Sequence, residues 1–144
     1  MQVRHVLDAR GRSVISVRPE APVKEALALF VIHGIGSVPV VDPSGKLIGI
    51  FTERDVLYGD FGDSEHFHRR LIGEVMTHDP ITCSADAPVS DVMDEMSHHR
   101  IGQVPVVDDG ALIGMVSVGD LIKSLHEQLE TENQHLTDYI HGRR

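Results

Sequence analysis

The sequence contains the same unit twice. Val-Pro-Val-Val-Asp at residues 38–42 recurs letter for letter at residues 104–108, an offset of 66 residues. With one residue fewer in the offset, Leu-Ile-Gly at 47–49 recurs at 112–114. Agreement at a fixed spacing over a long stretch is the signature of an internal duplication. Neither copy is large enough to bury a good core alone. We therefore expect the two copies to pack together as one pseudo-symmetric body.

The duplication also predicts how the chain is organised. The two copies cover residues 14–59 and 80–125. Residues 1–13 are expected to form an N-terminal helical segment, and residues 60–79 a linker with a short helix. The remaining residues, 126–144, are expected to be a C-terminal helical extension. The predicted fold class is α/β, with two pseudo-symmetric β-α-β-β-α repeats packed as one module and an extended C-terminal helix.

Each copy has the pattern of a strand, a helix, two strands and a helix. Short β-prone runs at 14–17 and 81–83 predict the first strands. Pro22 and Pro88 are expected at the first position of a helix, where a missing N–H is tolerated. Apolar residues then recur at helical spacing, which predicts a face packed in the core. This face consists of Val23, Ala26, Leu27, Phe30 and Val31 in the first copy and of Val89, Val92, Met93 and Met96 in the second.

The segments around the copies are less regular. Residues 58–73 are polar and rich in turn formers, and we expect them to be the most mobile part of the chain. After residue 119 a helix is expected to run to about Ile140 and to end at Gly142. Its apolar residues fall at heptad spacing over only three heptads. A coiled coil is therefore a weaker expectation than a helix laid across its own core or against a partner. The heptad residues are Ile122, Leu125, Leu129, Leu136 and Tyr139, and Glu132 occupies one of the same positions.

Composition and charge exclude several classes of protein. The formal net charge is −9, and the chain has no Trp, two Tyr and four Phe, which opposes a nucleic-acid binder with a basic face and stacking rings. The longest apolar run, residues 29–32, cannot span a bilayer. The first residues are charged where a signal peptide would be apolar, and a lone Cys83 suits a reducing compartment. We therefore expect a cytoplasmic protein that contacts neither membrane nor nucleic acid.

The residues that carry chemistry follow the last strand of each copy. A hydroxyl residue is followed three positions later by an aspartate, as Thr52 with Asp55 and Ser117 with Asp120. One interpretation is a helix cap, in which the hydroxyl and the acid satisfy free backbone N–H groups. The other is a ligand site, since a strand-to-helix junction offers N–H donors to a phosphate and a carboxylate accepts from a ribose diol. A glycine three positions before each hydroxyl lets a ligand approach the backbone. Both interpretations remain open at this point.

Taken together, these motifs resemble a tandem pair of CBS (cystathionine-beta-synthase) domains, or Bateman module, of the stand-alone bacterial kind. The resemblance rests on Gly-hydrophobic-x-Thr/Ser-x-x-Asp at 49–55 and 114–120, and on Ile-Gly-x-Val-Pro-Val-Val-Asp at 35–42 and 101–108. It implies a non-catalytic regulatory or energy-sensing module that binds AMP, ADP or ATP, or else NAD(H) or S-adenosylmethionine, in clefts between the repeats. It also implies a disc-shaped homodimer that acts on a downstream protein, which the sequence does not identify.

The resemblance also implies roles for individual residues. The hydroxyls of the motif would face phosphate or ribose, its carboxylates would hold ribose hydroxyls, and the Val-Pro dipeptides with nearby isoleucines would wall the adenine. Arg54 could neutralise a phosphate, whereas its counterpart is Gly119, so we expect the first cleft to take the phosphorylated ligand. Arg100 could partly compensate from the other wall. The implied contacts are Ile15, Val38, Pro39, Thr52, Arg54, Asp55, Ile81, Arg100, Val104, Pro105, Ser117 and Asp120.

Two rival interpretations remain. A structural or interaction protein of the same family would leave its clefts empty and use the caps only for helix stability. An enzyme is disfavoured because no nucleophile and base pair is recognisable. The pairs His66/His68 and His98/His99 lack a third ligand nearby in sequence, so we expect no metal and no obligatory cofactor.

Overall fold

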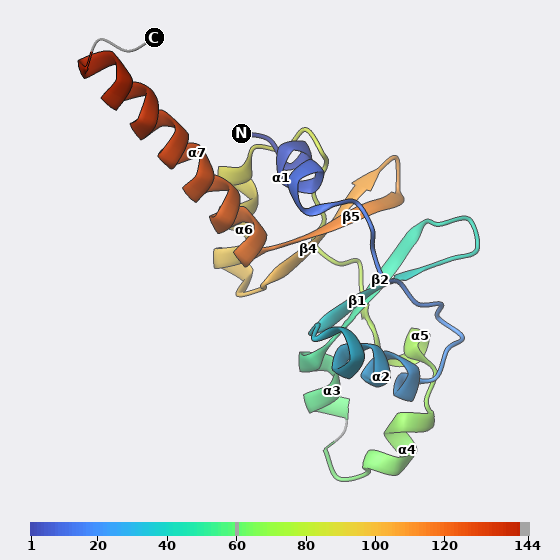
Figure 1. Cartoon of the computed structure of the whole chain (residues 1–144). Helices are drawn as coiled ribbons and strands as arrows, with labels where there is room; N and C mark the ends of the chain where they lie inside the picture. Colours follow the sequence, from blue (N-terminus) through green and yellow to red (C-terminus); the bar gives the residue numbers. More distant parts are fainter. Residues whose placement is uncertain (60, 142–144) are drawn as a thin grey trace.

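The computed structural model describes residues 1–59 and 61–141 and has a mixed α/β fold, as predicted (Figure 1). In chain order the elements are α1 (Val3–Arg10), α2 (Val23–His33), β1 (Ser37–Val41), β2 (Leu47–Thr52), α3 (Glu53–Gly59), α4 (Ser64–Arg69), α5 (Ile72–Val75), β3 (Thr77–His78), α6 (Val89–His99), β4 (Gln103–Asp108), β5 (Ala111–Ser117) and α7 (Val118–Ile140). Among the described helices, none is long and apolar enough to cross a membrane.

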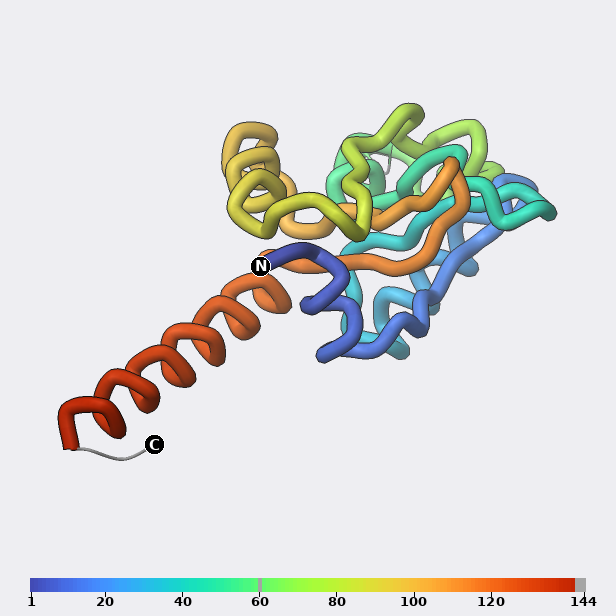
Figure 2. The backbone as a smooth tube through the Cα atoms, turned by 90° about the horizontal axis from the view of Figure 1, so that it is seen from above, coloured from blue at the N-terminus to red at the C-terminus, as the bar shows by residue number. Residues whose placement is uncertain are grey.

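The two repeats are built around matching antiparallel hairpins. Strand β1 pairs with β2 and strand β4 with β5, and each pairing has an irregularity at the same place, between Val40 and Val41 and between Val106 and Val107. The short strand β3 joins the first hairpin along β2. In Figure 2 the two hairpins lie side by side. Their turns exchange backbone hydrogen bonds, from Leu47 N to Gly110 O at 3.0 Å and from Leu112 N to Gly45 O at 3.1 Å, which supports packing as one module.

The predicted first strand of each copy is observed as an extended segment with a single parallel bridge. Val17 bridges Val40, and Cys83 bridges Val106. The Val17 N–H donates to Pro39 O at 3.0 Å. The next ladder bond would need an N–H on Pro39, which proline lacks, so the pairing stops there. Pro105 has the same effect in the second copy.

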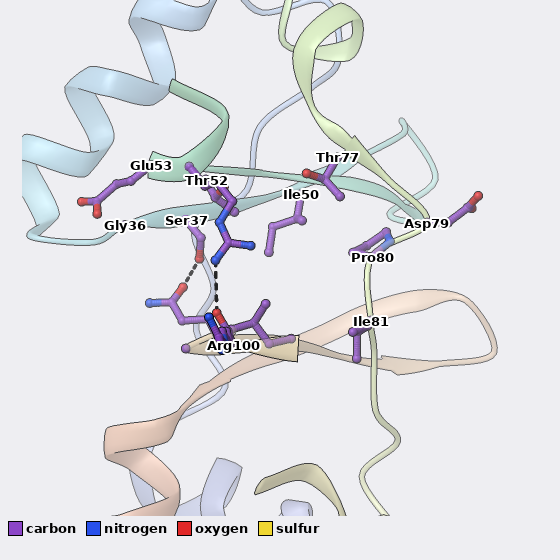
Figure 3. Close-up of a pocket in the computed structure, with 14 residues that line it drawn as sticks. Gly36, Ser37, Ile50, Thr52, Glu53, Thr77, Asp79, Pro80, Ile81 and Arg100 are labelled. Atoms are coloured by element: carbon purple, nitrogen blue, oxygen red, sulfur yellow. Dashed lines mark hydrogen bonds between the residues drawn. The ribbon is translucent and has the colours of Figure 1, made fainter. Parts of the chain in front are cut away.

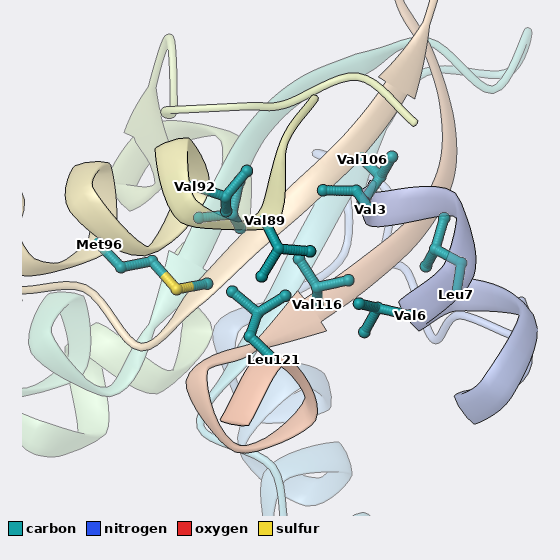
Figure 4. Close-up of a cluster of buried hydrophobic side chains, with 10 residues drawn as sticks. Val3, Val6, Leu7, Val89, Val92, Met96, Val106, Val116 and Leu121 are labelled. Atoms are coloured by element: carbon teal, nitrogen blue, oxygen red, sulfur yellow. The ribbon is translucent and has the colours of Figure 1, made fainter. Parts of the chain in front are cut away.

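Each repeat has its own hydrophobic core, and the segment before each copy completes the core of the other. Residues Val3, Val6 and Leu7 of α1 are buried in the core of the second repeat together with α6, β4 and β5 (Figure 4). Ile72 of α5, which precedes the second copy, is buried in the core of the first. This exchange ties the repeats together, since neither core is complete without a segment from elsewhere in the chain.

The prolines before α2 and α6 are N-caps, one position earlier than expected. The N–H of Val23 donates to Arg70 O at 2.8 Å, and the N–H of Val89 donates to Met1 O at 3.0 Å. The first N–H of each helix is therefore satisfied by a neighbouring segment. A proline inside the helix at that position would remove this bond.

Three other expectations are corrected by the structure. Val31 is 84% exposed and does not belong to the core face of α2. The segment expected to be the most mobile contains helix α4, whose Phe67 is only 2% exposed. Helix α7 packs only its first turns, around the buried Leu121, on α1, α6 and β5, and then leaves the body (Figure 1). The expected end at Gly142 lies outside the described residues.

Candidate functional site

A cleft of about 600 Å³ lies between the two repeats (Figure 3). Four of the residues predicted from the sequence line it, namely Thr52, Arg54, Ile81 and Arg100. They come from the start of α3, from the segment that follows β3 and from the end of α6. The full lining is Gly36, Ser37, Ile50, Thr52, Glu53, Arg54, Thr77, Asp79, Pro80, Ile81, Arg100, Ile101, Gly102 and Gln103.

The middle of the cleft is apolar. Ile50 points into it from β2, and Ile81 lies across from it on the opposite wall (Figure 3). Pro80 lies beside them, between the two walls. An apolar slot with polar groups at its ends is the usual form of a small-molecule site, and it suits a flat ring.

Two arginines meet at one side of the cleft. The Arg54 guanidinium donates to the backbone carbonyl of Arg100 at 3.3 Å, which joins the first repeat to the second. Arg100 caps α6 in the left-handed conformation, with φ 54° and ψ 45°. Gly34, its counterpart in the first repeat, has φ 63° and ψ 38°. Such a backbone costs a residue with a side chain about 1–2 kcal/mol. A strained cationic residue at a cleft is a candidate for a ligand contact.

The inner end of the cleft is closed by equivalent residues of the two repeats. Ser37 and Gln103 are 66 positions apart, and the Ser37 hydroxyl donates to the Gln103 side-chain oxygen (Figure 3). Ser37 is 8% exposed, so its hydroxyl needs this partner or a ligand in its place. The sequence analysis missed both residues, although each stands directly before the repeated Val-Pro dipeptide.

The hydroxyl and aspartate motifs form helix caps in both repeats. The Asp55 carboxylate accepts from the Thr52 N–H at 2.9 Å, and the Asp55 N–H donates to the Thr52 hydroxyl at 3.2 Å. Ser117 and Asp120 make the same pair of bonds at 2.9 and 3.0 Å. Both halves of the capping interpretation are therefore observed. The ribose role of the carboxylates stays a prediction, because neither Asp55 nor Asp120 lines the cleft.

The two carboxylates also have different third partners. Thr77 donates its hydroxyl to the free oxygen of Asp55 at 3.0 Å. Asp120 forms an ion pair with Arg10 of α1, with Nε and Oδ2 3.0 Å apart. A neutral hydroxyl is easier to displace than a charged partner. The carboxylate of the first motif is therefore the more accessible of the two to a ligand.

The remaining predicted residues lie outside this cleft. Val38 and Val104 are buried in the two cores, so only their backbone could meet a ligand. Ile15 and Ser117 occupy the positions equivalent to Ile81 and Thr52, on the opposite side of the pseudo-symmetric body. Pro39 and Pro105 complete the set of predicted residues that do not line the cleft.

The sequence analysis also missed Thr77 and Asp79, which line the cleft just before Ile81. The signal that could have found them is Asp-Pro directly before a predicted wall residue, because this pair favours a turn. Asp79 has a φ of 48°, a conformation that aspartate tolerates better than most residues. Glu53 and Asp79 add negative charge to the lining, so the cleft carries both signs. Within residues 1–59 and 61–141, no three His, Cys, Asp or Glu side chains gather to hold a metal ion.

Cys83 lies apart from the cleft, and burial raises the pKa of its thiol from 9.0 to about 11. We expect the folded protein to react slowly with a thiol reagent at pH 8 and faster as the pH approaches 11. Because the unfolded thiol ionises near its ordinary pKa of 9.0, the free energy of unfolding should fall as pH rises above that value. Labelling rates measured against pH check the first expectation. A rate at pH 8 equal to that of the unfolded chain would contradict it.

Comparison with known proteins identifies close matches. A family model described as CBS domain matches residues 5–60 and 72–127. The mitochondrial CBS domain-containing protein CBSX3 of Arabidopsis thaliana is 30% identical over 148 residues, which cover 97% of this chain and 72% of that protein. Other relatives are much longer, and the match spans 22% of the inosine-5'-monophosphate dehydrogenase of Korarchaeum cryptofilum.

Solved structures match as well. The CBS-domain containing protein ATU1752 from Agrobacterium tumefaciens has a TM-score of 0.80 and 33% identity, over 86% of this chain and 98% of that one. The CBS domain pair of protein MJ0100, in complex with 5-methylthioadenosine and S-adenosyl-L-methionine, has a TM-score of 0.75 and 30% identity. That match covers 89% of this chain and 98% of that one.

Proposed function

Because the chain belongs to the CBS domain family, we propose that it is a regulatory module that binds an adenosine-containing ligand in the cleft between its two repeats. The observation that carries the proposal is the combination of an apolar slot and two arginines in one cleft of about 600 Å³. That volume is within the range of small-molecule sites. The matching domain pair of MJ0100, with its two adenosine-containing ligands, supports the same class of ligand.

The polarity of the cleft orients this ligand. The adenine ring would lie between Ile50 and Ile81, and the ribose would lie toward Thr52. A phosphate would then meet Arg54 and Arg100, whose guanidinium groups match phosphate oxygens in charge and geometry. We therefore propose AMP, ADP or ATP as the ligands, ahead of NAD(H) or S-adenosylmethionine.

Binding would also change how the repeats are held together. A phosphate at Arg54 would replace the Arg100 carbonyl as the acceptor of its hydrogen bond. A ligand that reaches the inner end would compete for the Ser37 hydroxyl, which now bonds to Gln103. Both bonds join one repeat to the other, so occupancy would alter their relative position. We propose that a downstream protein reads this change and that the chain itself catalyses no reaction.

A ligand panel tests the proposal. At 100 times its dissociation constant, a ligand should raise the melting temperature of a chain of this length by roughly 5–10 °C. We expect such a shift with at least one of AMP, ADP and ATP. No shift with these, NAD(H) or S-adenosylmethionine would favour the rival interpretation, a structural CBS-pair protein with empty clefts.

The ribose contact is tested with 2'-deoxy ligands. If Asp55 or Thr52 bonds a ribose hydroxyl, the 2'-deoxy form should bind more weakly by about 0.5–1.5 kcal/mol, the net value of one hydrogen bond. Calorimetry with AMP and its 2'-deoxy form gives the difference. Equal affinities would remove the ribose role and leave Asp55 as a helix cap.

Arg100 should exchange stability for binding. Replacing it with glycine removes the strained backbone and should stabilise the fold by about 1 kcal/mol. The same change should lower the affinity for AMP, because one guanidinium is lost from the cleft. Urea unfolding and calorimetry measure the two effects. The matched control, Gly34→Arg, places the strain at the equivalent helix end of the first repeat, and it should destabilise the fold by a similar amount. Loss of stability in Arg100→Gly would contradict this account.

A homodimer is proposed from an exposed apolar patch on the first repeat. Five large side chains on α2, on α3 and just after it are between 72% and 93% exposed. Apolar patches of this kind mark interaction sites. A cavity of about 550 Å³ lies beside them. We define the apolar patch as Val31, Ile32, Leu57, Tyr58 and Phe61.

The dimer proposal has a direct test. Light scattering at micromolar concentration should give twice the mass of one chain. Leu57→Glu, which buries a charge if the patch is covered, should give the mass of one chain. Arg69→Glu changes a charge on α4 outside the patch and serves as the control. A monomer before any substitution would contradict the proposal.

A further inference from the structure

The outer part of α7 projects from the body with an apolar stripe that the described chain does not cover. Figures 1 and 2 show the helix leaving the body beside the second repeat. In Figure 1 it points away from the first repeat. Leu129 is 58% exposed, Leu136 61% and Tyr139 82%. An isolated helix of this length is marginal in water, so a partner along the stripe would stabilise it.

The charges of α7 are arranged as a pair of helices requires. Ile122, Leu129 and Leu136 repeat every seven residues, and Leu125, Glu132 and Tyr139 repeat every seven residues on the adjacent row. We call these six residues the α7 seam. The residues that flank the seam carry no Lys, Arg, Asp or Glu. Beyond Asp120, the charged residues of α7 outside the seam lie on its far side. They are Lys123, Glu127, Glu130 and Asp138. A second identical helix could therefore approach without like-charge repulsion.

The duplication indicates which partner meets the seam. Ile122 stands 65 residues after Leu57 of the apolar patch, so the seam begins at the equivalent place on the second repeat. The counterparts of Ile32 and Tyr58 are the polar residues His98 and Lys123. The apolar patch is therefore matched better by the same patch of a second copy than by the second repeat. In a dimer of this symmetry, like repeats face each other, and α7 meets α7.

From these observations we propose that α7 pairs in parallel with α7 of a second copy along the α7 seam. The direction follows from the fold. With like repeats facing each other, both helices leave beside the second repeats and point away from the first. The inference rests on the proposed dimer, because the seam beyond the body is too short to hold two chains together alone. The body contacts would raise the effective concentration of the two helices.

Disulfide trapping tests the pairing and its direction. In a Cys83→Ser background, Leu129→Cys and Leu136→Cys should each cross-link to the same residue of a second copy under mild oxidation. In a parallel pair, residues at these positions lie opposite their own copies. Gln134→Cys, on the far side of α7, is the matched control and should cross-link at least about tenfold more slowly.

The outcomes separate this inference from the others. Dimers by light scattering without faster cross-linking at 129 and 136 than at 134 would overturn the helix pairing and leave the body dimer standing. Cross-linking of Leu129→Cys to Glu132→Cys, without self-cross-linking, would show an antiparallel pair and overturn the direction. A monomer would overturn both the pairing and the dimer, while the ligand panel would still report on the proposed function.

A second variant avoids removing an apolar contact. Glu132 places a carboxylate inside the seam, so Glu132→Leu should tighten the dimer on the order of tenfold. Glu130→Leu makes the same change on the far side of α7 and should leave the dissociation constant nearly unchanged. Sedimentation over a range of concentrations measures both. An equal effect of the two substitutions would contradict the seam.

Discussion

Replacing Phe67 with alanine is expected to destabilise the fold by about 3–5 kcal/mol, the usual cost of deleting a buried phenyl ring. Phe67 comes from the short helix α4, and only 2% of its surface is exposed. Its ring lies 6.5 Å from that of Phe51, which lies 6.0 Å from that of Phe30. Alanine would leave a cavity at the end of this row. Urea unfolding measures the loss, and the melting temperature should fall by roughly 6–20 °C.

Phe61 supplies the matched control in the same connecting segment. It is 93% exposed, so Phe61→Ala removes an equal ring with almost no buried contact. At protein concentrations low enough to keep the chain monomeric, its effect should stay within about 0.5 kcal/mol. Similar losses in the two variants would mean that α4 does not anchor the first core. The segment would then behave as the mobile linker that its polarity suggests.

That segment shows where reading the sequence failed. Residues 58–73 contain so many polar and turn-forming residues that a single phenylalanine did not stand out. A local signal was present, because Asp63 caps α4 by accepting the His66 N–H at 3.1 Å. The cap predicts a helix start, but it does not predict that Phe67 reaches a core formed by distant residues. Packing over long sequence distances decides that.

The duplication made the rest of the fold predictable. Repeated turn residues and repeated apolar runs locate both hairpins, and helical spacing locates α2 and α6. The repeat does not reveal that α1 completes the second core rather than the first, because that choice depends on contacts about 80 residues apart, such as Val3 N to Ala87 O at 2.9 Å. It also does not reveal that Pro39 and Pro105 limit each first strand to one bridge.

The candidate site was predictable only where a motif carried it. Thr52 and Arg54 lie within the repeated motif, and both line the cleft. Ser37 and Gln103 differ between the copies, so the repeat gave no signal for them. The aspartates were assigned two roles from the same residues. The structure shows their capping bonds, and a bound ligand is needed to test the other role.

Arg54→Ala is expected to lower the affinity for AMP or ATP by about 1.5–3 kcal/mol, which is roughly 10- to 150-fold, and to leave adenosine nearly unaffected. Its guanidinium lines the cleft and reaches across to the second repeat. A hydrogen bond between two charged groups is worth more than a neutral one. Adenosine lacks the phosphate and loses only a weak contact. Calorimetry with AMP and adenosine on the same variant measures the difference.

Salt and a control variant separate a phosphate contact from a general effect of charge. The affinity of the unmodified chain for AMP should fall as salt is added, and the difference between it and Arg54→Ala should shrink, because part of the attraction is screened. Arg69→Ala removes the same charge from α4, where Arg69 pairs with Glu65 outside the cleft, and should change neither affinity. If Arg54→Ala weakens AMP and adenosine equally, the phosphate does not lie at Arg54, and the cleft must be oriented with its phosphate subsite elsewhere.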